Sequence, residues 1–255
     1  MNHPIQDWHG QRVWIIGASS GIGRATAELL LQKGATVAVS ARNQAALDEI
    51  VHTYPNAVAL AVDVTKPKSL QAAYQQFCAE QPLDLYLHCA ADYQPMRAWE
   101  MDSERMQRSM TINYGGVLNA LDVVLPDFLA RKKGRIVVIA SVAGYMGMPK
   151  ALAYGPTKAA LINLCESLYL DLKPRGVDVQ VVNPGFVATP LTAGNDFEMP
   201  DLMTAEDAAG ALVKGLESSR FEISFPKRFT SALKLIKRLP YGLKLRLLSK
   251  IESAS

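Results

Sequence analysis

Short apolar runs that alternate with longer helical stretches constrain the fold of this chain most. Seven runs rich in β-branched residues are expected to form strands, at residues 13–16, 36–40, 58–62, 83–88, 135–140, 177–182 and 221–225. Six stretches have helical composition and length, at residues 22–33, 44–53, 69–80, 103–131, 154–172 and 205–218. Strands that are apolar almost throughout are covered by helices on both faces of a parallel sheet. The alternation therefore predicts an α/β fold with a doubly wound, seven-stranded parallel sheet.

The size of the chain, 255 residues with 49% hydrophobic, predicts one undivided α/β domain. We expect a catalytic domain over residues 1–226 and a tail over residues 227–255. The first ten residues lack the pattern of a secretory signal, and no apolar run is long enough to span a bilayer. The three cysteines have no ligand spacing, so neither a disulfide framework nor a metal site is expected. A cytoplasmic location follows as the expectation.

A glycine-rich loop joins the first expected strand to the first expected helix. Glycine permits a tight turn and a close approach to a pyrophosphate, which the N–H groups at a helix start can bind. The loop predicts a Rossmann-type, dinucleotide-binding domain with cofactor contacts from Gly17, Ser19, Ser20, Gly21, Ile22 and Gly23. A purely structural turn is the alternative, and the position directly after the first strand argues against it.

The end of the second expected strand indicates which dinucleotide binds. Ala41 and Arg42 stand where an NAD-binding protein places an acidic residue for the ribose 2′-hydroxyl. A guanidinium can pair with the 2′-phosphate of NADP, whereas a carboxylate would repel it. We therefore expect NADP(H) in preference to NAD(H), with a solvated surface arginine as the alternative. Asp63 and Val64 lie where a contact with adenine is expected, although an aspartate there also suits a helix cap.

Four polar residues suggest an acid/base site. Tyr154 and Lys158 stand four residues apart, so they share one helix face, and the ammonium together with an oxidised nicotinamide is expected to lower the pKa of the phenol. Ser141 follows an expected strand, where active groups of open α/β sheets lie, and can donate to a substrate oxygen. Asn113 lies in a helical stretch beside two glycines, either as a tolerated kink or as an amide that holds water for proton exchange with Lys158. A buried tyrosine with a surface lysine is the alternative for the pair.

These motifs, in this order, resemble the short-chain dehydrogenase/reductase family over roughly residues 11–225. The resemblance rests on the glycine loop, on Asp63, Asn113 and Ser141, on the Tyr154 to Lys158 motif and on the run Asn183 to Pro190. It implies an oxidoreductase that exchanges a hydride between NADP(H) and an alcohol/carbonyl pair. It implies Tyr154 as general acid/base, Lys158 on the nicotinamide ribose, Ser141 on the substrate and Asn113 in a proton relay.

Further cofactor contacts follow from the same resemblance, at Ala90, Asn113, Tyr154, Lys158, Pro184, Gly185, Val187 and Thr189. The chain departs from the family pattern after the fourth expected strand, where His88-Cys89-Ala90-Ala91 replaces the usual Asn-Asn-Ala-Gly. Cys89 therefore lacks the hydrogen bonds of an asparagine, while Ala90 can still pack against the adenosine. Ile16, before the glycine loop, replaces a threonine that is frequent in the family. Neither change removes a catalytic group.

The expected substrate side is mostly apolar. Its candidate residues are Tyr93, Met96, Tyr145, Met146, Met148, Phe186, Leu191 and Phe197. Methionines adapt to irregular pockets, so this set favours a long or bulky hydrophobic, lipid-like substrate, with a plain core role as the alternative for part of it. The irregular stretch 186–203 is expected to act as a lid.

The tail is basic. Residues 225–255 carry a net charge of +7, which leaves −4 of the chain's overall +3 on the rest. The tail is expected to form two short amphipathic helices broken at Pro240 and Gly242, with Leu243, Leu247 and Ile251 on one face. Two environments remain open for it, an anionic membrane surface or packing against the body or another subunit. Nucleic-acid binding is less favoured because apolar residues interleave with the basic ones.

The leading hypothesis is an NADPH-dependent carbonyl reductase, or the reverse dehydrogenase, for a hydrophobic small molecule. The resemblance implies a homo-oligomer, a dimer or tetramer, paired through the helices that hold Asn113 and Tyr154. If the tail contacts a membrane, the protein is expected to be a peripheral protein on the inner membrane surface. The alternative is an NADP(H)-binding, membrane-associated sensor without turnover.

Overall fold

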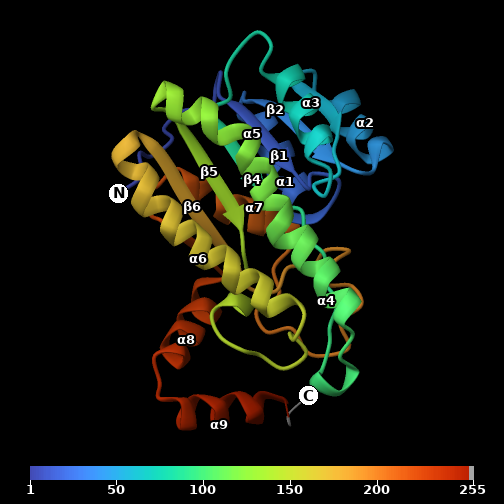
Figure 1. The fold of residues 1–255 in the computed structure, drawn as a ribbon, viewed down its shortest axis with the longest axis vertical. Coiled ribbons are helices and arrows are strands. Elements are labelled where there is room, and N and C mark those ends of the chain that lie inside the picture. Colours follow the sequence, from blue (N-terminus) through green and yellow to red (C-terminus); the bar gives the residue numbers. More distant parts are fainter. Residues whose placement is uncertain (253–255) are drawn as a thin grey trace.

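The centre of the protein is a seven-stranded parallel sheet in the order β3-β2-β1-β4-β5-β6-β7 (Figure 1). The computed structural model describes the backbone of residues 1–252 and the side chains of residues 1–249. The strands are β1 Arg12–Ile16, β2 Thr36–Ala41, β3 Ala57–Ala61, β4 Leu85–His88, β5 Gly134–Ile139, β6 Val177–Pro184 and β7 Glu222–Phe225. Every neighbouring pair is parallel. The predicted doubly wound sheet is confirmed, with its change of direction between β1 and β4.

Helices cover both faces of this sheet. They are α1 Gly21–Gln32, α2 Gln44–Thr53, α3 Pro67–Phe77, α4 Ser103–Met110, α5 Gly116–Arg131, α6 Tyr154–Leu172, α7 Ala205–Leu216, α8 Lys227–Lys237 and α9 Tyr241–Glu252. One core lies between the sheet and α1, α2 and α7, and the other between the sheet and α3, α5 and α6. Side chains alternate across β1, since Val13 and Ile15 enter the first core while Trp14 and Ile16 enter the second. Each such buried side chain contributes about 1.5–3 kcal/mol, so both faces drive folding.

The expected helix over residues 103–131 is interrupted. After α4, residues Thr111–Gly115 form a π-helical turn, and α5 continues from Gly116. A π turn inserts one extra residue into a helix and is frequent at functional sites. Asn113 lies at the middle of this turn and is fully buried. The amide is therefore held in a specific local geometry.

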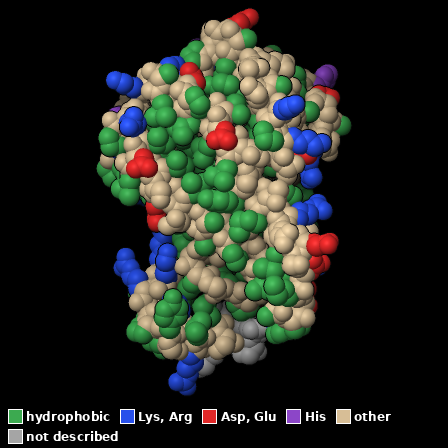
Figure 2. All heavy atoms as spheres, viewed as in Figure 1, with side chains coloured by type: hydrophobic (Ala, Val, Ile, Leu, Met, Phe, Trp, Pro, Cys, Tyr) green, Lys and Arg blue, Asp and Glu red, His purple; other side chains and the backbone are tan. Residues whose placement is uncertain are grey.

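The tail folds as two helices that are separated around Pro240, as predicted, whereas Gly242 lies inside α9 and does not break it. The two helices differ in their contacts. In α8, Leu233 is buried, Lys234 donates a 2.6 Å hydrogen bond to Glu222, and the ring of Phe229 lies 5.7 Å from that of Phe186. In α9, Leu248 is the buried position among residues 241–249. The side chain of Ile251, expected on the same face as Leu243 and Leu247, lies outside the described side chains. Figure 2 shows Lys and Arg side chains gathered at the lower end of the molecule, where both helices lie.

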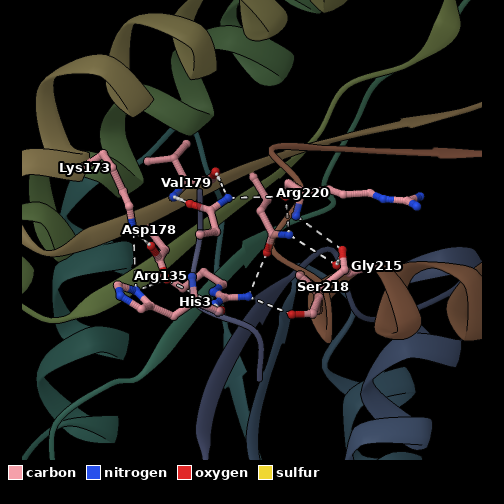
Figure 3. A network of polar contacts seen from close by, with 11 residues as sticks. His3, Arg135, Lys173, Asp178, Val179, Gly215, Ser218 and Arg220 are labelled. Atoms are coloured by element: carbon pink, nitrogen blue, oxygen red, sulfur yellow. Dashed lines mark hydrogen bonds and ion pairs between the residues drawn. The ribbon is translucent and has the colours of Figure 1, made fainter. Parts of the chain in front are cut away.

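The opposite end of the sheet is tied to the N-terminal segment by a buried polar network (Figure 3). The Arg135 guanidinium donates to the Asp178 carboxylate at 3.1 Å and to Gln180 Oε1 at 2.9 Å. Asp178 also accepts from Lys173 Nζ at 2.9 Å and from the backbone N–H of His3 at 3.0 Å. A buried ion pair is tolerated when its polar atoms are all bonded, as they are here. This network closes the end of the sheet that is remote from Ser141 and Tyr154.

No helix within residues 1–252 combines the length and the apolar character needed to cross a bilayer. The same described residues contain no group of three side chains suited to hold a metal ion, and the three cysteines are free thiols.

Candidate active site

A cavity of about 590 Å³ opens at the carboxyl ends of the strands, next to the switch point between β1 and β4. Open α/β sheets bind their ligands at this position. The predicted site residues that line it are Gly17, Ser19, Ser20, Gly21, Ile22, Arg42, Asp63, Val64, Ala90, Ser141, Tyr154, Lys158, Pro184, Gly185, Val187, Thr189 and Leu191. Segments that are far apart in the sequence thus meet in one cavity.

The glycine loop has the geometry of a phosphate cradle. Gly17 has φ +92°, and a Cβ there would lie 2.7 Å from Cα of Ala90, so only glycine fits. Gly21 has φ +54° and closely approaches Thr189. Ser20 is the N-cap of α1, and its side chain makes no capping hydrogen bond within the described residues. The hydroxyls and the first N–H groups of α1 are thus available to an anionic group in the cavity, which fits a dinucleotide.

Gly23 has a different role from the rest of the loop. It is buried and does not line the cavity. A Cβ at this position would lie 2.9 Å from the carbonyl carbon of Gly17. Gly23 therefore permits close packing of α1 on the loop and acts on any cofactor only through the position of Gly17.

Arg42 and Asp63 lie together at one end of the cavity. Both line it, and the positive charge of Arg42 contributes to holding the pKa of Asp63 below its usual range. The larger cause is Thr65, whose hydroxyl and N–H donate to Asp63 Oδ1 at 2.7 and 3.0 Å. One carboxylate oxygen of Asp63 thus fixes the turn before α3. Arg42 remains a cation on the cavity wall.

Lys158 is fully buried, which excludes the surface position considered for it. Its ammonium donates a 2.9 Å hydrogen bond to the carbonyl of Ile139 and lies 5.4 Å from the ring centroid of Tyr154. Both side chains reach the cavity from the first turns of α6. Burial lowers the pKa of Lys158 to about 8. The ammonium is therefore close to losing its proton near neutral pH.

The pKa of the Tyr154 phenol is raised in the chain alone, so the lowering predicted for the complex with oxidised nicotinamide stays a prediction. Burial is the largest cause, and the hydrogen bond with Ser141 opposes it without cancelling it. Ser141 itself caps a 3-10 turn by accepting from the N–H of Ala143 at 3.1 Å. Desolvation outweighs the favourable groups here because the phenolate would lose its hydration. In the chain alone, the phenol is therefore protonated at neutral pH.

Asn113 does not present its amide to water. Its Nδ2 donates to the carbonyl of Asp92 at 2.9 Å and to Thr157 Oγ1 at 3.0 Å, and its Oδ1 accepts from the N–H of Asp92 at 2.6 Å. Thr157 Oγ1 in turn donates to the carbonyl of Tyr154 at 2.7 Å. Both amide N–H groups are thus occupied within the protein, which leaves oxygen atoms of Asn113 as the groups that could bond a water. The predicted proton-relay role stays a prediction. These hydrogen bonds fix the start of α6 against the loop after β4.

Of the residues predicted for the substrate side, Leu191 lines the cavity, whereas Tyr93 and Phe186 do not. The ring of Tyr93 meets that of Tyr154 edge-on, with centroids 4.9 Å apart. The Tyr93 hydroxyl donates at 2.9 Å to Asn195, within the expected lid. Phe186 lies 5.8 Å from Phe197 of the same stretch. These rings form an apolar cluster that continues from Tyr154 into the irregular stretch 186–203.

The other predicted substrate residues belong to the core. Tyr145 is buried, donates its hydroxyl to the Glu222 carboxylate and does not line the cavity. Met96 is buried, and Met146 and Met148 pack against the core between the sheet and α6. The plain core role considered for part of this set therefore applies to Tyr145 and these methionines.

His88 and Cys89, which stand where the family usually has two asparagines, leave the sheet intact. The N–H of Cys89 donates to the carbonyl of Ile16 at 2.7 Å, so the backbone supplies a connection to β1. His88 is fully buried beside Tyr86, with its Nδ1 2.6 Å from the Tyr86 hydroxyl. Burial lowers the pKa of His88 to about 3, so the imidazole is neutral.

Several cavity residues escaped the sequence reasoning. Arg108, Thr111 and Ile112 line the cavity from the end of α4 and the π turn. Their spacing of three and four residues places them on one helix face and is a signal that could have found them. Thr192 also lines the cavity and donates to the carbonyl of Val187 at 2.6 Å. No pattern in the sequence marks Thr192.

Comparisons with known proteins agree with this site. Residues 11–199 match the family model described as short chain dehydrogenase. An uncharacterized oxidoreductase of Myxococcus xanthus is 35% identical over 231 residues, which are 89% of this chain and 91% of the relative. The 3-oxoacyl-(acyl-carrier-protein) reductase of Vibrio cholerae is 30% identical over 205 residues, 80% of this chain and 84% of the relative.

Solved structures share the fold. A short chain dehydrogenase of Burkholderia cenocepacia in complex with NADP has a TM-score of 0.84 at 22% identity, covering 95% of this chain and 99% of its own. A short chain dehydrogenase/reductase of Burkholderia phymatum in complex with NAD has a TM-score of 0.82 at 23% identity, covering 91% and 94%.

Fold, site and relatives together define an oxidoreductase that acts on the CH–OH/C=O pair. More narrowly, the chain belongs to the short-chain dehydrogenase/reductase family.

Proposed function

We propose that the protein uses NADPH to reduce a carbonyl on a hydrophobic, lipid-like molecule, or catalyses the reverse oxidation. The observation that carries this proposal is the convergence of Ser141, Tyr154 and Lys158 on the cavity that the glycine loop and Arg42 also line. A nicotinamide cofactor, when bound, supplies or accepts the hydride. The residues proposed to hold it are Gly17, Ser19, Ser20, Gly21, Ile22, Arg42, Asp63, Val64, Ala90, Tyr154, Lys158, Pro184, Gly185, Val187 and Thr189.

Tyr154 is proposed as the general acid for reduction. Its raised pKa keeps the phenol protonated, so it can donate a proton to the substrate oxygen as that oxygen gains negative charge. Ser141, which lines the same cavity and lowers the pKa of Tyr154, orients the same oxygen. Lys158 binds the ribose of the cofactor and favours the phenolate left behind. Asn113 acts as a positioning residue through Thr157.

NADP(H) is proposed over NAD(H). The two structural neighbours were solved with NADP and with NAD, so the fold accommodates either. The preference rests on Arg42 at the cavity wall and on Ala41 at the position where a carboxylate would repel a 2′-phosphate.

The substrate is proposed to be apolar near its carbonyl. The ring of Tyr93 meets that of Tyr154 edge-on, Leu191 lines the cavity, and the ring of Phe186 contacts that of Phe197. The Vibrio cholerae relative is named as a 3-oxoacyl reductase, which makes 3-oxoacyl thioesters one class to test.

We further propose that the protein is a cytoplasmic homo-oligomer, a dimer or tetramer, that pairs through α5 and α6. Leu118 on α5 and Leu170 on α6 are exposed, with 38% and 72% of their surface accessible, which supports an apolar contact there. The tail, residues 227–255, is proposed to bring the protein to the inner surface of an anionic membrane. Since α8 packs on the body, α9 is the part available for that contact.

The alternative function is a membrane-associated NADP(H) sensor without turnover. A panel of ketones, aldehydes, 3-oxoacyl thioesters and alcohols of graded chain length, followed by nicotinamide absorbance with NADPH and NADH in parallel, separates the two. The proposal expects turnover with NADPH that improves with chain length. Tight NADPH binding without turnover of any member would favour the sensor.

A further inference from the structure

Helix α9 exposes apolar side chains that a helix packed only on its own protein would bury. Leu243, Leu245 and Leu247 have 50%, 58% and 37% of their surface accessible, and Tyr241 has 75%. Leu248 is the anchor, with 6% accessible. Apolar groups gain free energy when removed from water, so a cluster of exposed leucines on one short helix marks a contact surface.

The exposed leucines do not all face the same way. Leu243 and Leu247 stand four residues apart and share one face, while Leu245 lies on another side. At 100° per residue, Lys244 and Arg246 flank the Leu243/Leu247 face, one on each side. We call Leu243 and Leu247 with these two cations the docking face. Long cationic side chains beside an apolar face can extend to phosphates while the leucines enter an apolar layer.

Charge complementarity identifies the partner. Residues 227–249 contain seven Lys and Arg and no Asp or Glu. Lys234 pairs with Glu222 of β7, so its charge is directed to the body. Lys237 and Arg238 are two further exposed cations at the junction between α8 and α9, and the ammonium of Lys237 lies 5.6 Å from the centroid of the Tyr145 ring. A purely cationic segment with exposed leucines suits an anionic bilayer better than a second copy of the same cationic segment.

The position of α9 relates the docking face to the active site. The carboxyl ends of β5 and β6 point toward the end of the molecule where α9 lies (Figure 1). Ser141 follows β5 and Gly185 follows β6 in the sequence. Leu191, which lines the cavity, is itself 40% exposed. Helix α8 connects the two regions, because Phe229 stacks on Phe186 next to Gly185.

We propose that α9 docks on the surface of an anionic lipid bilayer through Leu243, Leu247, Lys244 and Arg246. Docking holds the carboxyl edge of the sheet near the bilayer, so a lipid-phase carbonyl compound reaches Tyr154 from the membrane. The docking deepens the membrane contact proposed for the tail. The delivery of substrate rests on the proposed carbonyl reduction, whereas the docking does not.

The test is flotation of the full-length protein with vesicles of phosphatidylcholine containing phosphatidylglycerol, compared with phosphatidylcholine alone. Wild type is expected to bind the anionic vesicles at low salt and to be released as salt screens the charges. Leu243→Ser with Leu247→Ser should lower the partition coefficient roughly tenfold for each leucine. Leu245→Ser is the matched control on the same helix and should stay within about twofold of wild type.

Charge variants test the partner. Neutralising Lys237, Arg238, Lys244 and Arg246 to glutamine should lower anionic-vesicle binding about fivefold for each residue. The matched control neutralises four exposed cations away from the tail, Lys68, Lys132, Arg175 and Lys214, and should retain binding.

Several results would overturn docking: no flotation of wild type, equal binding to neutral vesicles, or equal loss in Leu245→Ser and in the Leu243/Leu247 variant. A change of oligomeric state in the Leu243/Leu247 variant, by sedimentation, would instead assign the face to a second copy. Turnover of a soluble ketone by every variant reports folding. Flotation of a protein that turns over no carbonyl would refute the proposed carbonyl reduction and leave docking intact. Turnover of a carbonyl by a protein that does not float would refute docking and leave the carbonyl reduction intact.

Discussion

Replacing Thr157 with valine tests how the start of α6 is held. Thr157 is buried, and its hydroxyl accepts from Asn113 Nδ2 at 3.0 Å and donates to the carbonyl of Tyr154 at 2.7 Å. Valine keeps the volume but removes the acceptor, so one buried N–H of Asn113 loses its partner. Such a loss costs about 1–3 kcal/mol. In a protein of this size, 1 kcal/mol shifts Tm by about 2–4 °C, so the expected decrease is roughly 2–12 °C.

The assay is thermal unfolding by circular dichroism, together with kcat on the best carbonyl from the panel. Thr157→Ser is the control, because it keeps both hydrogen bonds and loses one methyl group, at a cost of about 0.8 kcal/mol. We expect kcat to fall in Thr157→Val and to be largely retained in Thr157→Ser. A double-mutant cycle with Asn113→Leu should give a coupling energy of about 0.5–3 kcal/mol. Additive changes in the free energy of unfolding, or a Tm of Thr157→Val equal to that of wild type, would refute the role of the Thr157 hydroxyl as the link between Asn113 and Tyr154.

Three further predictions concern the cofactor site. Arg42→Ala should raise the Kd of NADPH roughly 10–100-fold and leave that of NADH nearly unchanged, by fluorescence titration, since a charged hydrogen bond is worth about 1.5–3 kcal/mol; equal loss for both cofactors would contradict the NADP assignment. Because the pKa of Lys158 is about 8, kcat/KM for NADPH should fall above that pH as the ammonium deprotonates. Lys158→Arg should remove this fall from the pH profile, because arginine keeps its charge. A fall that is unchanged in Lys158→Arg would assign it to another group. Gly17→Ala should abolish NADPH binding, because the added Cβ would overlap Ala90 and the backbone φ is +92°. Gly147→Ala is the control, since a Cβ there meets nothing within 4 Å, and it should bind NADPH like wild type. Tight NADPH binding by Gly17→Ala would contradict the phosphate cradle.

The sheet could be predicted because its signals are local. Each strand is a short apolar run and each covering helix a longer periodic one, and the order of the two classes fixes a parallel sheet. Spacing likewise predicted three residues that line the cavity, since Tyr154 and Lys158 share a helix face and Ser141 follows a strand. These features survive folding unchanged because they depend on neighbours in the sequence.

What the sequence did not reveal depends on contacts between distant segments. The π turn at Asn113 is stabilised by Asp92 and Thr157, which lie 21 and 44 residues away. Tyr145 is held in the core by Glu222, 77 residues along the chain. The raised pKa of Tyr154 comes from burial, which no motif encodes. Helix α8 packs on the body through Phe229 and Lys234. The alternation of basic and apolar residues in the tail does not determine whether the tail packs on the body or contacts another surface.

The role of Tyr154 is tested most directly by Tyr154→Phe, assayed for carbonyl-dependent oxidation of NADPH and, separately, for NADPH binding. The ring and its contact with Tyr93 are preserved, so only the proton donor is removed. We predict that turnover falls by about 10²–10⁴-fold while the Kd of NADPH stays close to that of wild type. Turnover by Tyr154→Phe at the wild-type rate would contradict the assignment of Tyr154 as the general acid.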